Sequence, residues 1–84
     1  MSECSAAVQA DRDLIAANIR AYRARRAMSQ REVADAMHAA GHYSWRGQVM
    51  STVERGERRV SADEILALAR VLNTFPVHLI SEPR

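Results

Sequence analysis

The stretch SQREVADAM, Ser29 to Met37, decides how the chain folds. It opens with a capping box, in which the Ser29 side chain accepts a hydrogen bond from the Glu32 amide and the Glu32 carboxylate accepts one from the Ser29 amide. Apolar residues follow at the spacing of one helix face, ending at Met37. Gly41 is expected to end this helix, because glycine is the residue most often found at helix C-termini. The stretch therefore predicts an amphipathic helix from Ser29 to about Gly41.

A second short helix is predicted directly after the first. It begins near Trp45 or Arg46 and ends at Glu54 or Arg55, where Gly56 supplies the left-handed residue after the helix. Its inward residues at helical spacing are Trp45, Met50 and Val53. The connection HAAGHYS between the two helices is longer than a tight turn, and it either extends the first helix or forms a small loop. Two short consecutive helices of this kind make a candidate helix-turn-helix.

Three further helices complete the expected fold. One precedes the pair, from about Ala7 or Asp11 to Arg26, with its buried stripe on Leu14, Ile15, Ile19 and Tyr22. Another begins at the second capping box, SADE, with its core face on Ile65, Leu66, Leu68, Ala69 and Leu72. The last starts around Thr74 and Pro76 and carries Val77, Leu79 and Ile80. No strand-like alternation is present, so the fold class is all-α, a compact bundle of five short helices.

The length of 84 residues allows one small domain. We expect a frayed N-terminal segment at residues 1–10, a single domain at residues 11–81 and a C-terminal tail at residues 82–84. The formal net charge is only +2, and all 12 basic residues are arginines. Most of them lie in two clusters, at residues 20–31 and 46–59, which indicates a local basic surface.

Several classes of protein are disfavoured by what the sequence contains. Cys4 is the single cysteine, so no internal disulfide forms, which suits a reducing cytosol. No apolar run approaches the roughly 20 residues that span a bilayer, and the N-terminus has no apolar signal region. The three histidines have no second cysteine and no carboxylate at metal-ligand spacing beside them. No nucleophile–base pair or phosphate-binding glycine loop is present. We expect a cytoplasmic protein that is not an enzyme and needs no metal or cofactor.

The order of the motifs is more specific than the composition. An arginine six residues before Ser29 (Arg23), then SQREVADAM, TVERGERRVS and ADEILALARVL follow one another at set spacings. In this order and at these spacings the chain resembles the Cro/repressor (XRE, lambda-repressor-like) family of helix-turn-helix DNA-binding domains, including phage and actinobacterial members, over roughly residues 15–80. The Ser-Gln that opens the first helix of the pair and the Glu-Arg-Gly that closes the second are the most specific marks.

The resemblance implies that the second helix of the pair lies in the major groove of DNA. The positions that contact base edges in relatives are here Arg46, Gly47, Gln48, Val49 and Thr52. The phosphate-contacting positions are Ser29, Gln30, Ser51, Arg55, Arg58 and Arg59. Arg23 and Glu54 stand where relatives form a structural ion pair. Gly47 departs from the family pattern, because relatives often place a polar base reader there.

The partners implied by the resemblance are double-stranded DNA and a second copy of the chain. Relatives dimerise through their C-terminal helices, which makes Val77, Leu79 and Ile80 candidate dimer contacts. A two-fold dimer would read two half-sites roughly 34 Å apart. The expected function is a transcriptional regulator, a repressor that occupies operator DNA in a bacterial cell or a phage-infected host. The alternatives are an antitoxin of a toxin–antitoxin pair and a protein–protein interaction module of the anti-repressor type on the same fold.

Overall fold

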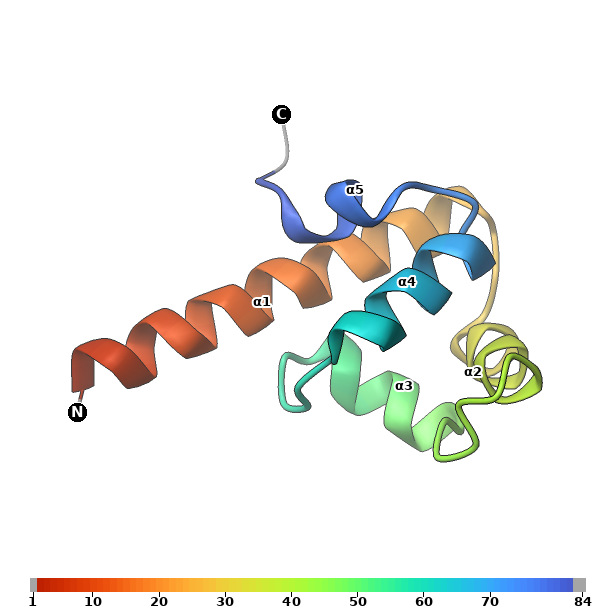
Figure 1. The fold of residues 1–84 in the computed structure, drawn as a ribbon, viewed down its shortest axis with the longest axis horizontal. Helices are drawn as coiled ribbons and strands as arrows, with labels where there is room; N and C mark the ends of the chain where they lie inside the picture. Colours follow the sequence, from red (N-terminus) through yellow and green to blue (C-terminus); the bar gives the residue numbers. More distant parts are fainter. Residues whose placement is uncertain (1, 83–84) are drawn as a thin grey trace.

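The structure, a computed structural model, describes residues 2–82 and their side chains from Ala6 onward. Within this range the chain forms five α-helices and no strand, which confirms the all-α prediction (Figure 1). The helices are α1 Ser2–Arg25, α2 Gln30–Ala39, α3 Gly47–Glu54, α4 Ala62–Val71 and α5 Pro76–Ile80. Of the tail expected at residues 82–84, all but Glu82 lies outside the described residues, as does the first residue of the segment at 1–10.

Helix α1 starts earlier than the sequence predicted. We expected it to begin at Ala7 or Asp11, whereas it begins at Ser2 and runs through the segment for which fraying was expected. Alanine-rich sequence has a high helix propensity, which favours this continuation. The Gln9 side chain also donates hydrogen bonds to Asp13 Oδ1 and to the carbonyl of Gly56, at 2.9 and 3.0 Å. The N-terminal end of α1 nevertheless projects beyond the other helices (Figure 1).

Both predicted capping boxes are formed. Ser29 Oγ accepts from the Glu32 amide at 3.0 Å, and Glu32 Oε1 accepts from the Ser29 amide at 2.8 Å. The hydrogen bond from the Ser29 amide, followed by the interaction with the Ser29 side chain, lowers the pKa of the Glu32 carboxyl group. At the start of α4, Ser61 and Glu64 make the same reciprocal pair. Local sequence therefore fixes where α2 and α4 begin.

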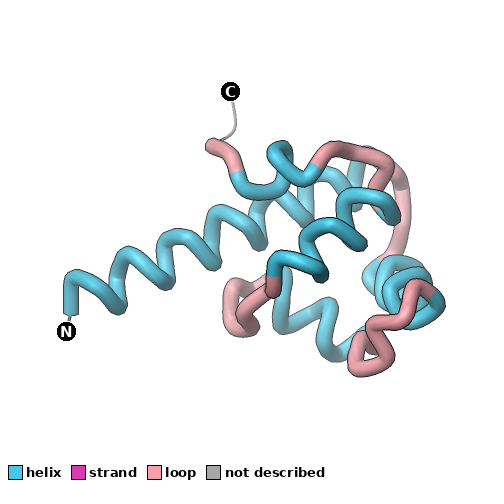
Figure 2. The backbone as a smooth tube through the Cα atoms, in the orientation of Figure 1, coloured by secondary structure: helices cyan, strands magenta, loops and turns pink. Residues whose placement is uncertain are grey.

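The long connection between α2 and α3 is a compact loop and not an extension of α2. Helix α2 ends at Ala39, and Gly41 follows with a φ of 104°, in the region that favours glycine. The His42 amide then donates to the carbonyl of Met37, and the Trp45 amide donates to the carbonyl of His42, both at 3.0 Å. This loop and the one between α3 and α4 are clear in the tube drawing (Figure 2). The loop delivers Trp45 into the core immediately before α3 begins.

The core is built from all five helices around Trp45. The fully buried large side chains are Trp45, Ile19, Met37, Met50, Leu68, Leu72, Leu79, Val33 and Val53. Helix α5 is held to α1 by the buried Asn18, whose amide donates to the carbonyls of Leu79 and Ser81 at 3.0 and 2.9 Å. The prediction that Leu66 lies on the core face of α4 was wrong. Leu66 is 49% exposed and Ala67 is buried in its place, because α4 turns the neighbouring side of its helix toward α2 and α5.

Two leucines on α4 allow a matched test of this packing. Leu68→Ala removes a side chain with 0% exposure, so we expect a loss of about 2–5 kcal/mol in the free energy of unfolding. Leu66→Ala removes one that is half exposed, and the loss should stay below about 1 kcal/mol. Urea denaturation followed by circular dichroism measures both. Equal losses for the two variants would contradict the observed orientation of α4.

Candidate nucleic-acid interface

Helix α3 has one face in the core and one face outward. Met50 and Val53 are fully buried, whereas Val49 and Thr52 are only partly buried and Gln48 is exposed. Arg46, also exposed, is the residue before the helix. Its backbone is extended, and its side chain makes no capping hydrogen bond to the helix. The Thr52 hydroxyl donates to the carbonyl of Val49 at 2.7 Å. The residues expected to contact bases therefore lie at the start and along the outward side of α3.

The C-terminal end of α3 is fixed by the carboxylate of Glu54, which is only 3% exposed. Arg23 Nε and Nη2 donate to its two oxygens at 2.5 and 2.9 Å, and Gln30 Nε2 donates to Oε1 at 3.0 Å. Arg20 Nη1 donates to the backbone carbonyl of Glu54. The Arg23–Glu54 pair is thus part of a network from α1 and α2, in which the hydrogen bond to Glu54 raises the pKa of Arg23 against the opposing effect of burial.

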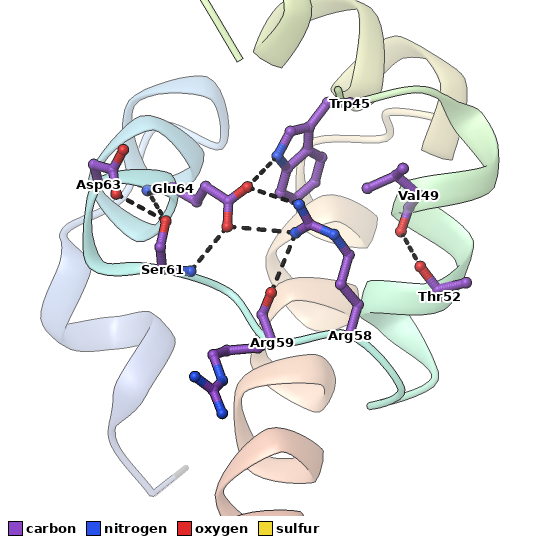
Figure 3. A network of polar contacts seen from close by, with 8 residues as sticks. All are labelled: Trp45, Val49, Thr52, Arg58, Arg59, Ser61, Asp63 and Glu64. Carbon is purple, nitrogen blue, oxygen red and sulfur yellow. Dashed lines mark hydrogen bonds and ion pairs between the residues drawn. The ribbon is translucent and has the colours of Figure 1, made fainter. Parts of the chain in front are cut away.

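The N-terminal end of α3 is fixed by a second buried carboxylate, Glu64 (Figure 3). Trp45 Nε1 donates to Glu64 Oε2 at 2.7 Å, and Arg58 Nη2 donates to the same oxygen at 3.1 Å. The amide of Ser61 donates to Glu64 Oε1 at 2.8 Å. The guanidinium carbon of Arg58 also lies 5.3 Å from the centroid of the Trp45 ring, within the range of a cation–π contact.

The pKa of Glu64 reflects the balance of these contacts. Burial by itself raises the pKa of a carboxyl group, but the hydrogen bonds from Arg58, from the Ser61 amide and from Trp45 outweigh it. They lower the pKa from 4.5 to about 2. Sequence reasoning assigned Glu64 only to a helix cap. A buried tryptophan N–H needs an acceptor, and this was the signal that a partner for Trp45 existed.

The residues expected to contact phosphate differ in whether their polar groups already have partners within the chain. Ser29 is exposed at the start of α2, but its hydroxyl oxygen already accepts a hydrogen bond from the backbone amide of Glu32. The side-chain amide of Gln30 already donates one to the Glu54 carboxylate. Arg55 is exposed and pairs with Glu57, at 3.1 Å, and with Ser51. Nothing in the sequence distinguishes Arg58 from Arg59, but the structure places Arg58 against Trp45 and Glu64 with 30% of its side chain exposed.

Three of the expected contact residues have unengaged side chains. Arg46, Gln48 and Arg59 are exposed, and none donates a side-chain hydrogen bond to any residue that the structure describes. Their donors are available to an external partner. A firmly held α3 thus carries the unengaged Gln48, with the unengaged Arg46 just before the helix and Arg59 in the loop after it.

Metal binding and membrane spanning can be examined directly in the described residues. Among residues whose side chains are described, no group of three or more histidine, cysteine, aspartate or glutamate residues is placed to hold a metal ion. His38 packs edge-on against Tyr43, and His78 stacks on Tyr22. No helix in residues 2–82 is both long enough and apolar enough to cross a membrane.

The network around Glu54 predicts a large effect of removing one partner. Arg23→Ala leaves a nearly inaccessible carboxylate without its main counter-charge, so the free energy of unfolding should fall by about 3 kcal/mol. Arg31→Ala is the matched control, because Arg31 lies 4.0 Å from Asp35 in a solvent-exposed pair worth about 0–1 kcal/mol. Urea denaturation at neutral pH measures both. In the double variant Arg23→Ala/Glu54→Gln, part of the lost stability should return.

The lowered pKa of Glu64 predicts a specific pH dependence. Because the pKa is lower in the folded chain, the stabilisation is fully present above about pH 4.5 and is lost as the pH falls toward 2. Glu64→Gln should therefore cost on the order of 2–3 kcal/mol at pH 7, and the gap to the parent chain should shrink between pH 5 and pH 3. The exposed Glu57→Gln serves as the control. A gap that stays constant across this pH range would contradict the assignment.

Comparison with known proteins places the chain in a family. Neither the curated proteins nor the solved structures contain a significant match to it. A family model described as a helix-turn-helix domain matches residues 14–82, which covers all of α2 to α5 and the C-terminal half of α1. The arrangement of α2 and α3 agrees with this match and with the Cro/repressor-like resemblance, while the phage and actinobacterial relationship stays a prediction. The chain belongs to the helix-turn-helix domain family.

Proposed function

We propose that this chain is a sequence-specific regulator of transcription that binds double-stranded DNA through α3. The observation that carries the proposal is the contrast within α3. Its two ends are fixed by buried carboxylates, while the side chains of Arg46 and Gln48, at its start, make no hydrogen bond to any described residue. Side chains that read base edges must be held on a rigid element and must have free donors and acceptors.

The chemistry of the outward residues suits base recognition in the major groove. Arginine can donate two hydrogen bonds to guanine O6 and N7, and glutamine can pair with adenine N6 and N7. The Thr52 hydroxyl is already bonded within α3, so we assign Thr52 and Val49 to apolar contact with a thymine methyl group. Gly47, with no side chain, would permit the closest approach of the helix backbone to the bases.

Phosphate contacts would hold the helix in register on the duplex. We assign them to Ser29 and Gln30 at the start of α2, and to Ser51, Arg55 and Arg59 around the end of α3. A helix N-terminus favours an anion, which supports the first pair. Arg58 would contribute in a secondary way, since its guanidinium already contacts Glu64 and Trp45.

A two-fold dimer is the form that we propose to bind two half-sites. Of the three candidate contacts on α5, Leu79 is fully buried in the core, so we leave it out of the surface proposed for dimer contact. Val77 and Ile80 are 55% and 52% exposed, and Phe75 beside them is 70% exposed. These three apolar side chains form the surface that we assign to dimer contact. The dimer would act as a repressor by occupying operator DNA in the cytoplasm of a bacterial cell or a phage-infected host.

Selection from a random pool of duplex DNA, followed by affinity measurement against salt, tests the function. We expect one enriched site and a linear fall in log affinity with log salt, with a slope of about −0.9 for each phosphate neutralised. A flat salt response without an enriched site would sink the proposal. That outcome would favour a protein partner, as for an antitoxin or an anti-repressor module.

Two variants separate base reading from phosphate contact. Gln48→Ala should relax the preference at one base position and cost about 1–3 kcal/mol on the selected site, with little effect on other sequences. Arg59→Ala should weaken binding to all sequences about equally and reduce the salt slope by about 1. Fluorescence anisotropy with the selected duplex and a scrambled one measures both. Identical specificity profiles for Gln48→Ala and the parent chain would contradict the assignment of Gln48.

A further inference from the structure

A pocket with a volume of about 470 Å³ lies between α1 and α5. The lining residues are Asn18, Ala21, Tyr22 and Arg25 on α1, and Val77, His78, Ser81 and Glu82 on α5 and directly after it. Pockets that hold small ligands have volumes of roughly 300–1,000 Å³. Helix α5 lies on the far side of α4 from α3 (Figure 1), so this pocket is separate from the residues proposed to contact DNA.

The buried polar group of this pocket is the side-chain amide of Asn18, which is 6% exposed. Its nitrogen donates to the carbonyls of Leu79 and Ser81, and these two hydrogen bonds fix the orientation of the amide. Its oxygen Oδ1 accepts no hydrogen bond from any described residue. Because no buried side-chain oxygen in the described part of the chain lacks a partner, Oδ1 is not sealed from solvent. The atom therefore stays open to a donor that enters the pocket.

The aromatic wall of the pocket is already ordered within the chain. The rings of Tyr22 and His78 lie parallel, with 5.8 Å between their centroids and 5° between their planes. His78 Nδ1 lies 2.7 Å from Thr74 Oγ1, within hydrogen-bond distance, and Phe75 packs edge-on against the His78 ring. Side chains that are held in one orientation lose little entropy when a ligand binds, so this wall suits a flat ring.

Two opposite charges line the pocket without being paired. The guanidinium carbon of Arg25 lies 4.7 Å from the centroid of the Tyr22 ring, and both Arg25 and Glu82 are exposed. The ion pairs found among the described residues include neither Arg25 nor Glu82. A guanidinium group can bind a carboxylate through two parallel hydrogen bonds, and a carboxylate can accept from an ammonium group. A ligand that carries both charges and a flat ring therefore matches the chemistry of the lining.

We propose that the pocket between α1 and α5 binds a free aromatic amino acid. The carboxylate of the ligand contacts Arg25, its ammonium group contacts Glu82, and its ring packs against Tyr22 and His78. A ring N–H, as in tryptophan, donates to Asn18 Oδ1. The site gives the chain a small-molecule binding activity that does not depend on DNA.

Titration of the isotope-labelled chain with unlabelled probes, followed by heteronuclear NMR, tests the site. L-tryptophan carries every group that the proposal uses, whereas tryptamine lacks the carboxylate, indole-3-propionate lacks the ammonium group and L-alanine lacks the ring. We expect L-tryptophan to shift the Asn18 side-chain amide and the α5 backbone amides saturably, with a Kd of about 1 mM or below. Each of the other three probes should bind at least about threefold more weakly.

Two charge variants assign the two ends of the ligand. Arg25→Gln should weaken L-tryptophan binding about tenfold and leave tryptamine binding unchanged, because tryptamine has no carboxylate. Arg26→Gln is its control, since Arg26 is exposed and does not line the pocket. Glu82→Gln should weaken L-tryptophan binding about threefold and leave indole-3-propionate binding unchanged.

A pair of alanines on α1 tests the space itself. Ala21 lines the pocket and Ala24 does not, and both are exposed. Ala21→Leu should fill the pocket and weaken L-tryptophan binding more than about tenfold, whereas Ala24→Leu should leave it unchanged. The melting temperatures of both variants should stay close to that of the parent chain, because neither substitution enters the core.

The outcomes separate this inference from the proposed function. A parent chain without saturable shifts on addition of L-tryptophan overturns the pocket. Equal affinities for L-tryptophan and tryptamine, or equal losses in Arg25→Gln and Arg26→Gln, overturn the assignment of an amino acid as the ligand. A chain that binds L-tryptophan in the expected pattern but selects no DNA supports the pocket and overturns the proposed function alone.

Discussion

Two buried carboxylates, Glu54 and Glu64, constrain the rest of the structure. A carboxylate cannot be removed from water unless hydrogen bonds and positive charge replace its hydration. Glu54 takes these from Arg23 and Gln30, and Glu64 takes them from Arg58, Trp45 and the Ser61 amide. Because one network lies at each end of α3, the orientation of that helix depends on residues from every neighbouring segment.

Local features were predictable from the residues alone, and long-range contacts were not, apart from the Arg23–Glu54 pair, which the family resemblance implied. The sequence indicated both capping boxes, the order of five helices and the inward Trp45 because these depend on residues within a few positions of each other. It missed the role of Glu64, which joins residues 19 positions apart, and it placed Leu66 in the core because periodicity alone cannot orient a helix that is apolar on most sides. The start of α1 was placed too late, although the alanine-rich segment before Asp11 has a high helix propensity and Gln9 also contacts Gly56 across the fold.

The arginines of this chain divide into two groups that composition cannot separate. Arg20, Arg23 and Arg58 bind carbonyl or carboxylate oxygens of the chain itself, whereas Arg46 and Arg59 are exposed and unengaged within the described residues. The formal net charge of +2 therefore understates how basic the outward surface around α3 is. Arginines that are paired with oxygens of the chain interact only weakly with outside ions. The positive charge that remains available is therefore concentrated around α3.

Because the exposed side chains around α3 are separate from those that hold the fold together, the domain can accept substitutions at the exposed positions. Arg46 and Gln48 lie outside the core and outside both carboxylate networks, so their identity is almost independent of folding. A chain with this property can exchange its outward residues one at a time without passing through unfolded variants. Substitutions at these two positions would alter the proposed DNA-contacting surface, while Trp45, Glu54 and Glu64 have little freedom to vary. The proposed contact surface can therefore be altered while the fold that carries it stays the same.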